Sequence, residues 1–401
     1  MKIYKLKNVI QTYAWGSPEM IPRMLGQANP AGTPQAELWM GAHPKGESLC
    51  IGEGKSEPLS RLIEKSPEQI LGTSSFLKFG SKLPFLLKVL AAGKPLSIQA
   101  HPDLEQAKKG FARENKAGIP IDAPERNYRD SNHKPELIYA LTPFWALKGF
   151  RKIDEIIVEF YSLALPSISL QIDRFKEHPH KDGLKEFFQF LLTLDKKRKH
   201  TLCSEIVSEA EKREGDRYSW ILRLNKEYPG DIGILCPLLL NCFCLEPGKA
   251  MFLNAGVLHA YLEGFGIELM ANSDNVLRGG LTPKHIDVPE LLKTLTFDTG
   301  PAELLKPEAS GNAIEIYTPP VDEFRLIKAE LNGKNSYKGE VKRNIEIAIC
   351  TRGRTSITIT AKSGNSGVVN LSQGESVCIP ADIPGYTISG KGIVFIAGVP
   401  V

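Results

Sequence analysis

The stretch GKAMFLNAGVLHAY, residues 248–261, carries the main signal for the architecture because a related stretch returns near the end of the chain. GESVCIPADIPGYT, residues 374–387, repeats the order of an initial glycine, an apolar run and a turn. When the two initial glycines are aligned, His259 of the first copy faces Gly385 of the second. Apolar runs bounded by turn residues are typical of β-strands. We therefore predict two related β-barrels, of which only the first can hold a metal.

Short strands are also predicted on both sides of this repeat. ELWMGA (37–42) and LPFLLKVL (83–90) are largely apolar segments that read as strands. The last hundred residues consist of short apolar segments separated by tight-turn residues, which favours a β-sandwich or jelly roll. A stretch rich in proline and glycine at 297–313 predicts a linker before this final region.

Between these β regions the pattern changes to that of helices. IDEIIVEF (153–160) and LKEFFQFL (184–191) place apolar residues three and four positions apart, with charged residues between them. The sequence therefore predicts a mainly β protein with a helical insertion, built from two jelly-roll barrels and an α-helical domain. The expected ranges are 1–150 and 235–300 for the first barrel with its metal site, 151–234 for the helical domain, and 301–401 for the second barrel.

The composition excludes several classes of function. The 401 residues carry a net charge of only +4, with both signs interspersed, so neither a nucleic-acid-binding arm nor a membrane-binding patch is predicted. No apolar run approaches the roughly 20 residues that a membrane-spanning helix needs. The first residues lack the apolar core of a secretory signal, and the seven cysteines are an odd number, which predicts free thiols and a cytoplasmic location.

Polar side chains interrupt an apolar run in PLSIQAHPD, residues 95–103. Burying a polar group costs roughly 1–3 kcal/mol unless the group finds a partner. Because alternate residues of a strand share a face, Ser97, Gln99 and His101 are expected to point the same way. This face therefore needs a polar partner or a ligand.

Two further strands show the same alternation. Lys134 and Glu136 align in NHKPELIY, and His259 and Tyr261 align in VLHAYLEG. Two imidazoles, a carboxylate and an amide oxygen suit zinc, although manganese or cobalt could also bind. The candidate ligands are Gln99, His101, Glu136 and His259. The spacing alone leaves open the alternative that these are hydrogen-bonded core residues.

Charged residues near these strands favour a ligand-binding site. Lys88 lies among apolar residues in PFLLKVL, and Glu268, Arg278 and Lys284 follow the strand of His259. Arginine and lysine are common partners of phosphate. One hypothesis covers all four residues, namely an anionic, polyhydroxylated small molecule bound beside a metal. For Lys284 alone, a solvated loop residue is an equally good interpretation.

Seven sequence blocks, in order between residues 13 and 287, resemble the type I mannose-6-phosphate isomerase family of the cupin superfamily. The blocks are YAWGS, AELWMGAHP, LPFLLKVL, LSIQAHPD, NHKPEL, LHAYLEG and SDNVLRGGLTPKHID. The C-terminal region resembles the second cupin domain of that family more loosely. The resemblance implies an isomerase that interconverts mannose 6-phosphate and fructose 6-phosphate through a cis-enediol. It also implies one zinc ion per chain.

The resemblance implies roles for individual residues as well. The implied zinc ligands are Gln99, His101, Glu136 and His259. The residues implied in or beside the chemistry are Arg278, Glu268, Lys134 and Tyr261. The residues implied at the substrate phosphate are Ser97, Lys88 and Lys284. The proton-transfer base stays open among Glu268, Lys134 and a metal-bound hydroxide.

One position departs from the family pattern, because Asn254 stands where the family usually has proline. Asparagine also serves in turns, so we expect the metal site to be intact. His133 has the opposite strand parity to Lys134 and is expected to be structural. Two histidines and a carboxylate also describe non-haem metal oxygenases, and a non-catalytic sugar-phosphate-binding or regulatory cupin is a further alternative. We expect a monomer.

Overall fold

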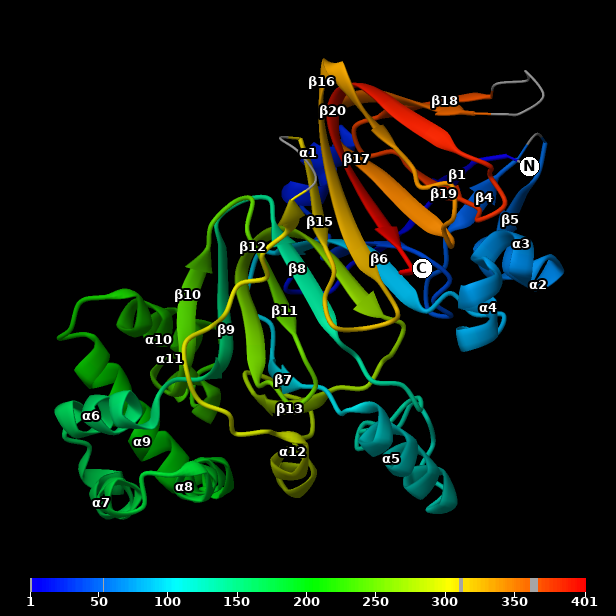
Figure 1. The fold of residues 1–401 in the computed structure, drawn as a ribbon. Helices are drawn as coiled ribbons and strands as arrows, with labels where there is room; N and C mark the ends of the chain where they lie inside the picture. The colour runs from blue at the N-terminus through cyan, green and yellow to red at the C-terminus, as the bar shows by residue number, and fades with distance from the viewer. Residues whose placement is uncertain (1, 53, 310–312, 361–366) are drawn as a thin grey trace.

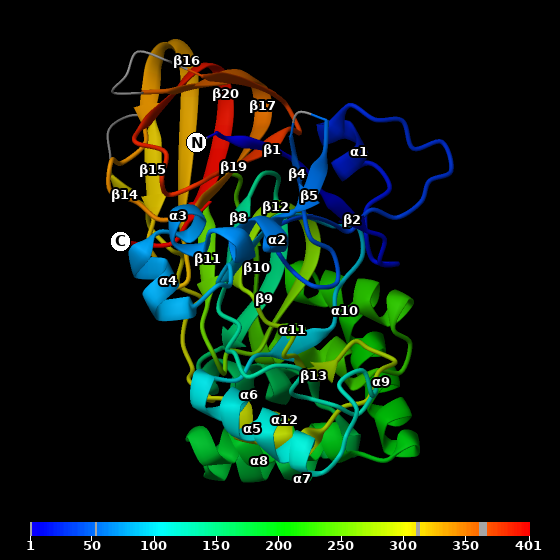
Figure 2. The same cartoon turned by 90° about the vertical axis from the view of Figure 1, so that its right-hand side faces the viewer.

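Two ten-stranded antiparallel sheets and a group of helices make up the computed structural model, which describes residues 2–52, 54–309, 313–360 and 367–401 (Figure 1). We call the sheet that contains His259 the first barrel, and the sheet that contains the C-terminal strands the second barrel. The helices of the insertion lie at one end of the molecule and the second barrel at the other, with the first barrel between them (Figure 1, Figure 2).

The first barrel is organised by strand β12, His259–Ala271, which pairs with β6, β7, β8 and β9. The main path of the sheet runs β10-β9-β12-β6-β3-β2, and β7, β8, β11 and β13 join beside it. Because one strand contacts four others, side chains from distant parts of the sequence meet along it. The remaining strands are β2 Val9–Gln11, β3 Glu37–Met40, β6 Phe85–Ala92, β7 Ile98–Ala100, β8 Glu136–Ala140, β9 Phe144–Phe150, β10 Leu240–Leu245, β11 Ala250–Leu253 and β13 Leu277–Gly280.

Three strands from the beginning of the chain belong to the second barrel. Strand β1 pairs with β19, β4 pairs with β1, and β5 pairs with β4. This pairing was not predicted. The C-terminal strands are also longer than the short segments predicted there, since β16 and β17 have 14 residues each and β20 has 13. The strands are β1 Tyr4–Lys7, β4 Leu49–Ile51, β5 Ser56–Pro58, β14 Glu308–Ala309, β15 Ile314–Tyr317, β16 Arg325–Lys338, β17 Glu346–Ile359, β18 Val368–Ser372, β19 Ser376–Ile379 and β20 Tyr386–Gly398.

The internal repeat is present as two strand–turn–strand units. When Gly248 is aligned with Gly374, β11 coincides with β19. The start of β12 then corresponds to Gly385, but β20 begins one residue later, at Tyr386. Both initial glycines have a positive φ, 89° and 86°, which side chains rarely allow. The turn before each unit therefore needs glycine for the same physical reason.

The predicted helical insertion is present. Helices α6 and α8 bury the apolar stripes that predicted them, including Ile156, Phe160, Phe187 and Leu191. In the described part of the chain, seven helices outside the predicted range 151–234 were not predicted, namely α1 to α5, α11 and α12. The helices are α1 Met20–Leu25, α2 Leu59–Lys65, α3 Pro67–Leu71, α4 Thr73–Phe79, α5 Leu104–Lys116, α6 Ile153–Leu163, α7 Ser169–Glu177, α8 Lys181–Thr193, α9 Lys196–Ala210, α10 Asp216–Glu227, α11 Cys236–Leu239 and α12 Val288–Thr294, with 3₁₀ turns at Pro166–Ile168 and Ile232–Leu235.

One hydrophobic core joins the two barrels. Leu87 and Ile267 of the first barrel belong to the same buried cluster as Ile347 and Phe395 of the second. The predicted architecture of two β-barrels with a helical insertion is thus confirmed, with more helix outside the insertion than expected. The domain ranges stay a prediction, and residues 310–312 of the expected linker lie outside the described residues. No helix in the described part of the chain could cross a membrane.

Candidate metal centre and substrate cavity

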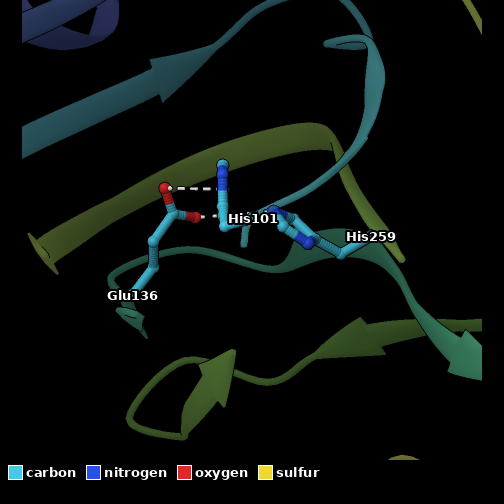
Figure 3. A group of neighbouring side chains, drawn as sticks. All are labelled: His101, Glu136 and His259. Carbon is cyan, nitrogen blue, oxygen red and sulfur yellow. Dashed lines mark ion pairs between the residues drawn. The ribbon is translucent and has the colours of Figure 1, made fainter. Parts of the chain in front are cut away.

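Three ligand-type side chains converge inside the first barrel. His101 follows β7, Glu136 begins β8 and His259 begins β12, and their side chains point toward one another (Figure 3). His101 Nε2 lies 3.3 Å from Glu136 Oε1, and His259 Nε2 lies 3.5 Å from Glu136 Oε2. One ligand atom from each residue lies within 4.8 Å of the others, and all three residues are buried. The three side chains therefore meet at one point, although His101 lies one residue beyond the strand from which its facing was predicted.

The hydrogen bonds of the two imidazoles determine what they can bind. His101 Nδ1 lies 2.8 Å from the backbone oxygen of Asn275, and His259 Nδ1 lies 2.8 Å from that of Val257. A carbonyl oxygen only accepts, so each Nδ1 carries the proton and each Nε2 presents a lone pair. Neither Nε2 has a hydrogen-bond partner among the described residues, and the same holds for Glu136 Oε2. Two nitrogens and a carboxylate oxygen with unused electron pairs fit a zinc ion.

The protonation states also suit a metal. Burial lowers the pKa of His101 to about 4 despite the nearby Glu136 carboxylate, so its imidazole is neutral near pH 7. Burial opposes ionisation of Glu136, but Lys134 and His101 outweigh it and hold the pKa of this carboxyl well below its usual range. Lys134 Nζ lies 3.0 Å from Glu136 Oε1. The site therefore offers the neutral imidazole of His101 and the ionised carboxylate of Glu136.

Gln99 lies beside this group in the sheet. In β7 it stands opposite His259 of β12 on one side and opposite Arg278 of β13 on the other. Its side chain lines the same cavity as Arg278. Its role as a fourth ligand stays a prediction.

A cavity of about 510 Å³ lies next to these strands and collects most of the predicted site residues. Glu268 and Tyr261 lie behind its wall, both buried on β12. The hydroxyl of Tyr261 has no hydrogen-bond partner among the described residues. The predicted residues that line the cavity are Lys88, Ser97, Gln99, Lys134, Arg278 and Lys284.

A row of charged side chains crosses three neighbouring strands at the cavity wall. In register, Glu268 of β12 stands opposite Lys88 of β6, which stands opposite Trp39 of β3. Lys88 Nζ lies 2.9 Å from Glu268 Oε2 and 3.3 Å from Glu37 Oε1, while Trp39 Nε1 donates to Glu37 Oε2 at 2.7 Å. Glu37 was missed by the sequence analysis. Its alternation with Trp39 in ELWM was the available signal.

The pKa values in this row are shifted by burial and by the neighbours. Burial raises the pKa of Glu268, and the carboxylates of Glu136 and Glu37 add to this effect while Lys88 opposes it. Burial works against the charge of Lys88, but Glu268 and Glu37 outweigh it and raise the pKa of the ammonium group. The positive charge of Lys88 is thus already shared between two carboxylates.

Cations without carboxylate partners line another part of the cavity. Arg129, Arg278 and Lys284 lie there, and none has a carboxylate within 4.0 Å in the described part of the chain. Burial, and then the other cations, lower the pKa of Arg278 and of Lys284. Lys45 also lines this region, but its Nζ lies 2.8 Å from Asp274. We call Lys45, Arg129, Arg278 and Lys284 the cationic mouth. Arg129 was missed because the two arginines of RNYRD, residues 126–130, form no pattern that marks a site.

The structure places two further residues that the sequence analysis singled out. Asn254 lies in the turn before His259, where its Oδ1 accepts from the backbone N–H of Ala255 at 2.9 Å. His133 Nε2 lies 2.7 Å from Oε1 of Glu323, a residue between β15 and β16. The departure at Asn254 therefore leaves the His259 strand in place.

Two family models match the chain. One is described as phosphomannose isomerase type I, catalytic domain, and matches residues 3–153; the other is described as the helical insertion domain of the same type and matches residues 167–240. The chain is 41% identical over 392 residues to a mannose-6-phosphate isomerase of Escherichia coli (strain K12), with 97% of each chain covered. It is 34% identical over 420 residues to that of Homo sapiens, with 96% of each covered.

Solved structures give the same result. The fold superimposes with a TM-score of 0.92 on a mutant of phosphomannose isomerase from Salmonella typhimurium, at 39% identity and with 100% of both chains covered. It superimposes with a TM-score of 0.91 on a zinc-bound mannose 6-phosphate isomerase, at 40% identity and again with 100% of both chains covered.

Proposed function

Because the chain belongs to the type I phosphomannose isomerase family, we propose that its cavity divides the isomerase reaction among a zinc centre, the Glu268–Lys88 row and the cationic mouth. The enzyme interconverts mannose 6-phosphate and fructose 6-phosphate in a zinc-dependent reaction. One observation carries this division of roles. Imidazole and carboxylate atoms with unused electron pairs lie beside the cavity, and cations without carboxylate partners line it.

In this proposal His101, Glu136 and His259 hold the zinc ion, and Gln99 supplies a fourth ligand. Each chain binds one ion. When bound, zinc supplies a positive charge that polarises the substrate oxygens on C1 and C2. Lys134 balances the Glu136 carboxylate from the cavity side and is well placed to contact the sugar oxygens.

Glu268 is proposed as the base that moves the proton between C2 and C1. The reaction removes a proton from one of these carbons, forms a cis-enediol and returns the proton to the other carbon. A carboxylate with a raised pKa accepts a carbon-bound proton more readily than an ordinary one. Lys88 pairs with this carboxylate at 2.9 Å. Tyr261, on the same strand, has a buried hydroxyl without a partner among the described residues and is proposed to support the site from behind the cavity wall.

Arg278 is proposed to stabilise the negative charge that develops on the enediolate oxygens. It stands opposite Gln99 in the sheet, and therefore close to the metal ligands. Lys284 and Ser97, together with Arg129, are proposed to bind the phosphate. Lys88 was also predicted there, but its two carboxylate partners make it a weaker candidate than Lys284.

The domain ranges, the oligomeric state and the location are also proposals. We infer a catalytic first barrel from 1–150 and 235–300, a helical domain at 151–234 and a second barrel at 301–401, with β1, β4 and β5 lent to the second barrel. The seven cysteines are all free thiols, which supports a reducing, cytoplasmic location. A monomer is expected and is testable by light scattering on the purified protein.

The decisive experiment is a coupled assay for fructose 6-phosphate combined with metal analysis on the same sample. We expect turnover of mannose 6-phosphate and one zinc per chain. Turnover that persists in chelator-treated, metal-free enzyme would refute the zinc proposal. Sugar-phosphate binding without turnover would favour a regulatory cupin, and substrate-dependent oxygen consumption would favour an oxygenase.

A further inference from the structure

Asn275 lies between the metal ligand His101 and the segment that carries Arg129, and it contacts both. It is completely buried, with 0% of its surface exposed. Its backbone oxygen accepts from His101 Nδ1 at 2.8 Å. Its side-chain Oδ1 accepts from the backbone N–H of Arg129 at 2.7 Å and from that of Asp130 at 3.2 Å. One residue thus touches the metal centre with its backbone and the cationic mouth with its side chain.

Every hydrogen-bonding position of this amide is occupied. Asn275 Nδ2 donates to the backbone oxygens of Asp130 at 2.9 Å and Asn132 at 2.8 Å. A flipped amide would place its NH₂ group against two N–H donors and its oxygen against two carbonyls, so only one orientation is stable. Ser273 reinforces the arrangement, since its Oγ donates to Asp130 Oδ1 at 2.9 Å and accepts from the Asn275 N–H at 3.2 Å.

The segment that Asn275 holds, residues 129–136, carries functional groups at both ends. It begins with Arg129 at the cavity and leads through Lys134 to the proposed ligand Glu136. On the other side, Asn275 leads into β13 and Arg278. A shift of Asn275 would therefore move the backbone oxygen that accepts the His101 proton. It would also move the backbone segments that carry Arg129 and Arg278.

We propose that Asn275 is a positioning residue that couples the zinc centre to the cationic mouth. Its backbone oxygen sets the tautomer and ring orientation of His101, and its amide fixes the backbone from which Arg129 reaches the cavity. The inference rests on the proposed function, in which Arg129 helps to bind the substrate phosphate. Partners of metal-ligating imidazoles typically contribute 10–100-fold to metal affinity.

The test measures zinc and phosphate separately in the variant Asn275→Ala. Zinc release from the zinc-loaded protein is followed with a chromogenic chelator, and binding of inorganic phosphate is measured by calorimetry on both zinc-loaded and metal-free protein. We expect zinc release to accelerate about 10–100-fold. We also expect phosphate binding to weaken roughly threefold or more in both forms, because Arg129 loses its fixed position. Asn275→Asp keeps the side-chain volume but turns a carboxylate oxygen toward two carbonyls, so it should show both defects.

Asn132→Ala is the matched control. Asn132 is an exposed neighbour whose side chain donates only one long bond, 3.4 Å to the backbone oxygen of Asn272, and the carbonyl that Asn275 uses is retained. We expect this variant to match the wild type in both measurements. If Asn275→Ala does not fold, Ser273→Ala decides, with smaller changes expected in the same two quantities.

The coupling is refuted if only one of the two quantities changes in a folded Asn275 variant, or if neither does. Unchanged zinc release and phosphate binding in Ser273→Ala would refute it when the Asn275 variants do not fold. A wild-type enzyme that binds no phosphate would instead refute the anion site of the proposed function. The two failures are therefore distinguishable.

Discussion

Each barrel buries a carboxylate, and a cation lies beside each of them, Lys134 at Glu136 and Arg343 at Glu346, but their other neighbours differ. Glu136 in the first barrel faces two imidazole nitrogens that carry lone pairs. Glu346 in the second barrel faces donors, since the Tyr386 hydroxyl lies at 2.8 Å and the Arg343 guanidinium at 3.2 Å. Donors of the chain itself contact Glu346 Oε2, although Glu346 Oε1 has no hydrogen-bond partner among the described residues. Around Glu136, a carboxylate oxygen and two imidazole nitrogens all lack partners in the described part of the chain, and these are ligand-type atoms.

The pKa shifts of the two carboxyl groups run in opposite directions. Burial raises the pKa of Glu346 even though Tyr386 and Arg343 oppose it, whereas Lys134 and His101 overcome burial and lower the pKa of Glu136. The difference begins at one position of the internal repeat, where His259 opens β12 and Gly385 precedes β20. The two copies of the repeat therefore differ at the position where the first copy carries the proposed ligand His259.

Removing a ligand from the first barrel is the most severe test of this comparison. His259→Ala should abolish most zinc binding and lower isomerase activity more than about 100-fold, because a direct ligand contributes more than its outer partners do. Metal analysis and the coupled assay on the same preparation measure both. A variant that keeps its zinc and its activity would show that the three side chains are ordinary core residues.

Loss of the Arg278 guanidinium should slow the chemistry while leaving the metal in place. Arg278→Ala is expected to lower kcat about 10²–10³-fold, because the charge it meets develops only in the transition state. Arg278→Lys should recover part of the rate, since a point charge lacks the planar fork. Steady-state kinetics with zinc content checked in each variant provides the measurement.

Lys284→Ala is the partner experiment for Arg278. The phosphate is charged in substrate and transition state alike, so KM should rise about tenfold, equivalent to about 1.4 kcal/mol, with a smaller change in kcat. If Arg278→Ala changes only KM and Lys284→Ala changes kcat, the two proposed roles must be exchanged.

A substitution beside the buried carboxylate of the second barrel should lower the stability of the protein without changing its catalysis. Tyr386→Phe removes the hydroxyl that donates to Glu346, and a hydrogen bond to a buried charge contributes about 2 kcal/mol. We expect a lower midpoint of denaturant unfolding, with zinc content and kcat of the folded enzyme unchanged. A loss of zinc in this variant would mean that the second barrel supports the metal centre directly, contrary to the division drawn above.

The smallest expected change concerns pH. If ionised Glu268 is the base, activity rises as pH increases through its raised pKa. Glu37→Gln removes a negative charge that helps to raise this pKa, so the acid limb of the kcat profile should move to lower pH. Glu186→Gln, on the exposed face of α8, is the control and should leave the limb in place. An acid limb that stays fixed or moves upward in Glu37→Gln would exclude Glu268 as the titrating base.

Local patterns predicted a large part of this protein. Strand alternation predicted a shared inward facing for His101, Glu136 and His259, because side chains repeat every two residues along a strand. Glu136 and His259 begin strands, whereas His101 lies one residue beyond β7. The 3.6-residue period marked α6 and α8, and the glycine-initiated repeat marked the two barrels. The family resemblance then supplied the zinc and the reaction, which alternation alone left open against a hydrogen-bonded core.

Contacts between distant segments required the tertiary structure. The pairing of β1 with β19, the row from Glu37 through Lys88 to Glu268, and the clamp of Asn275 on the Arg129 segment all join residues far apart in the sequence. Hydrophobic periodicity reports which face of an element is buried, but not which other element covers that face. The sequence therefore revealed the residue types and the faces on which they lie. Only the folded chain established which of these residues form ion pairs, hydrogen bonds or strand pairs with one another.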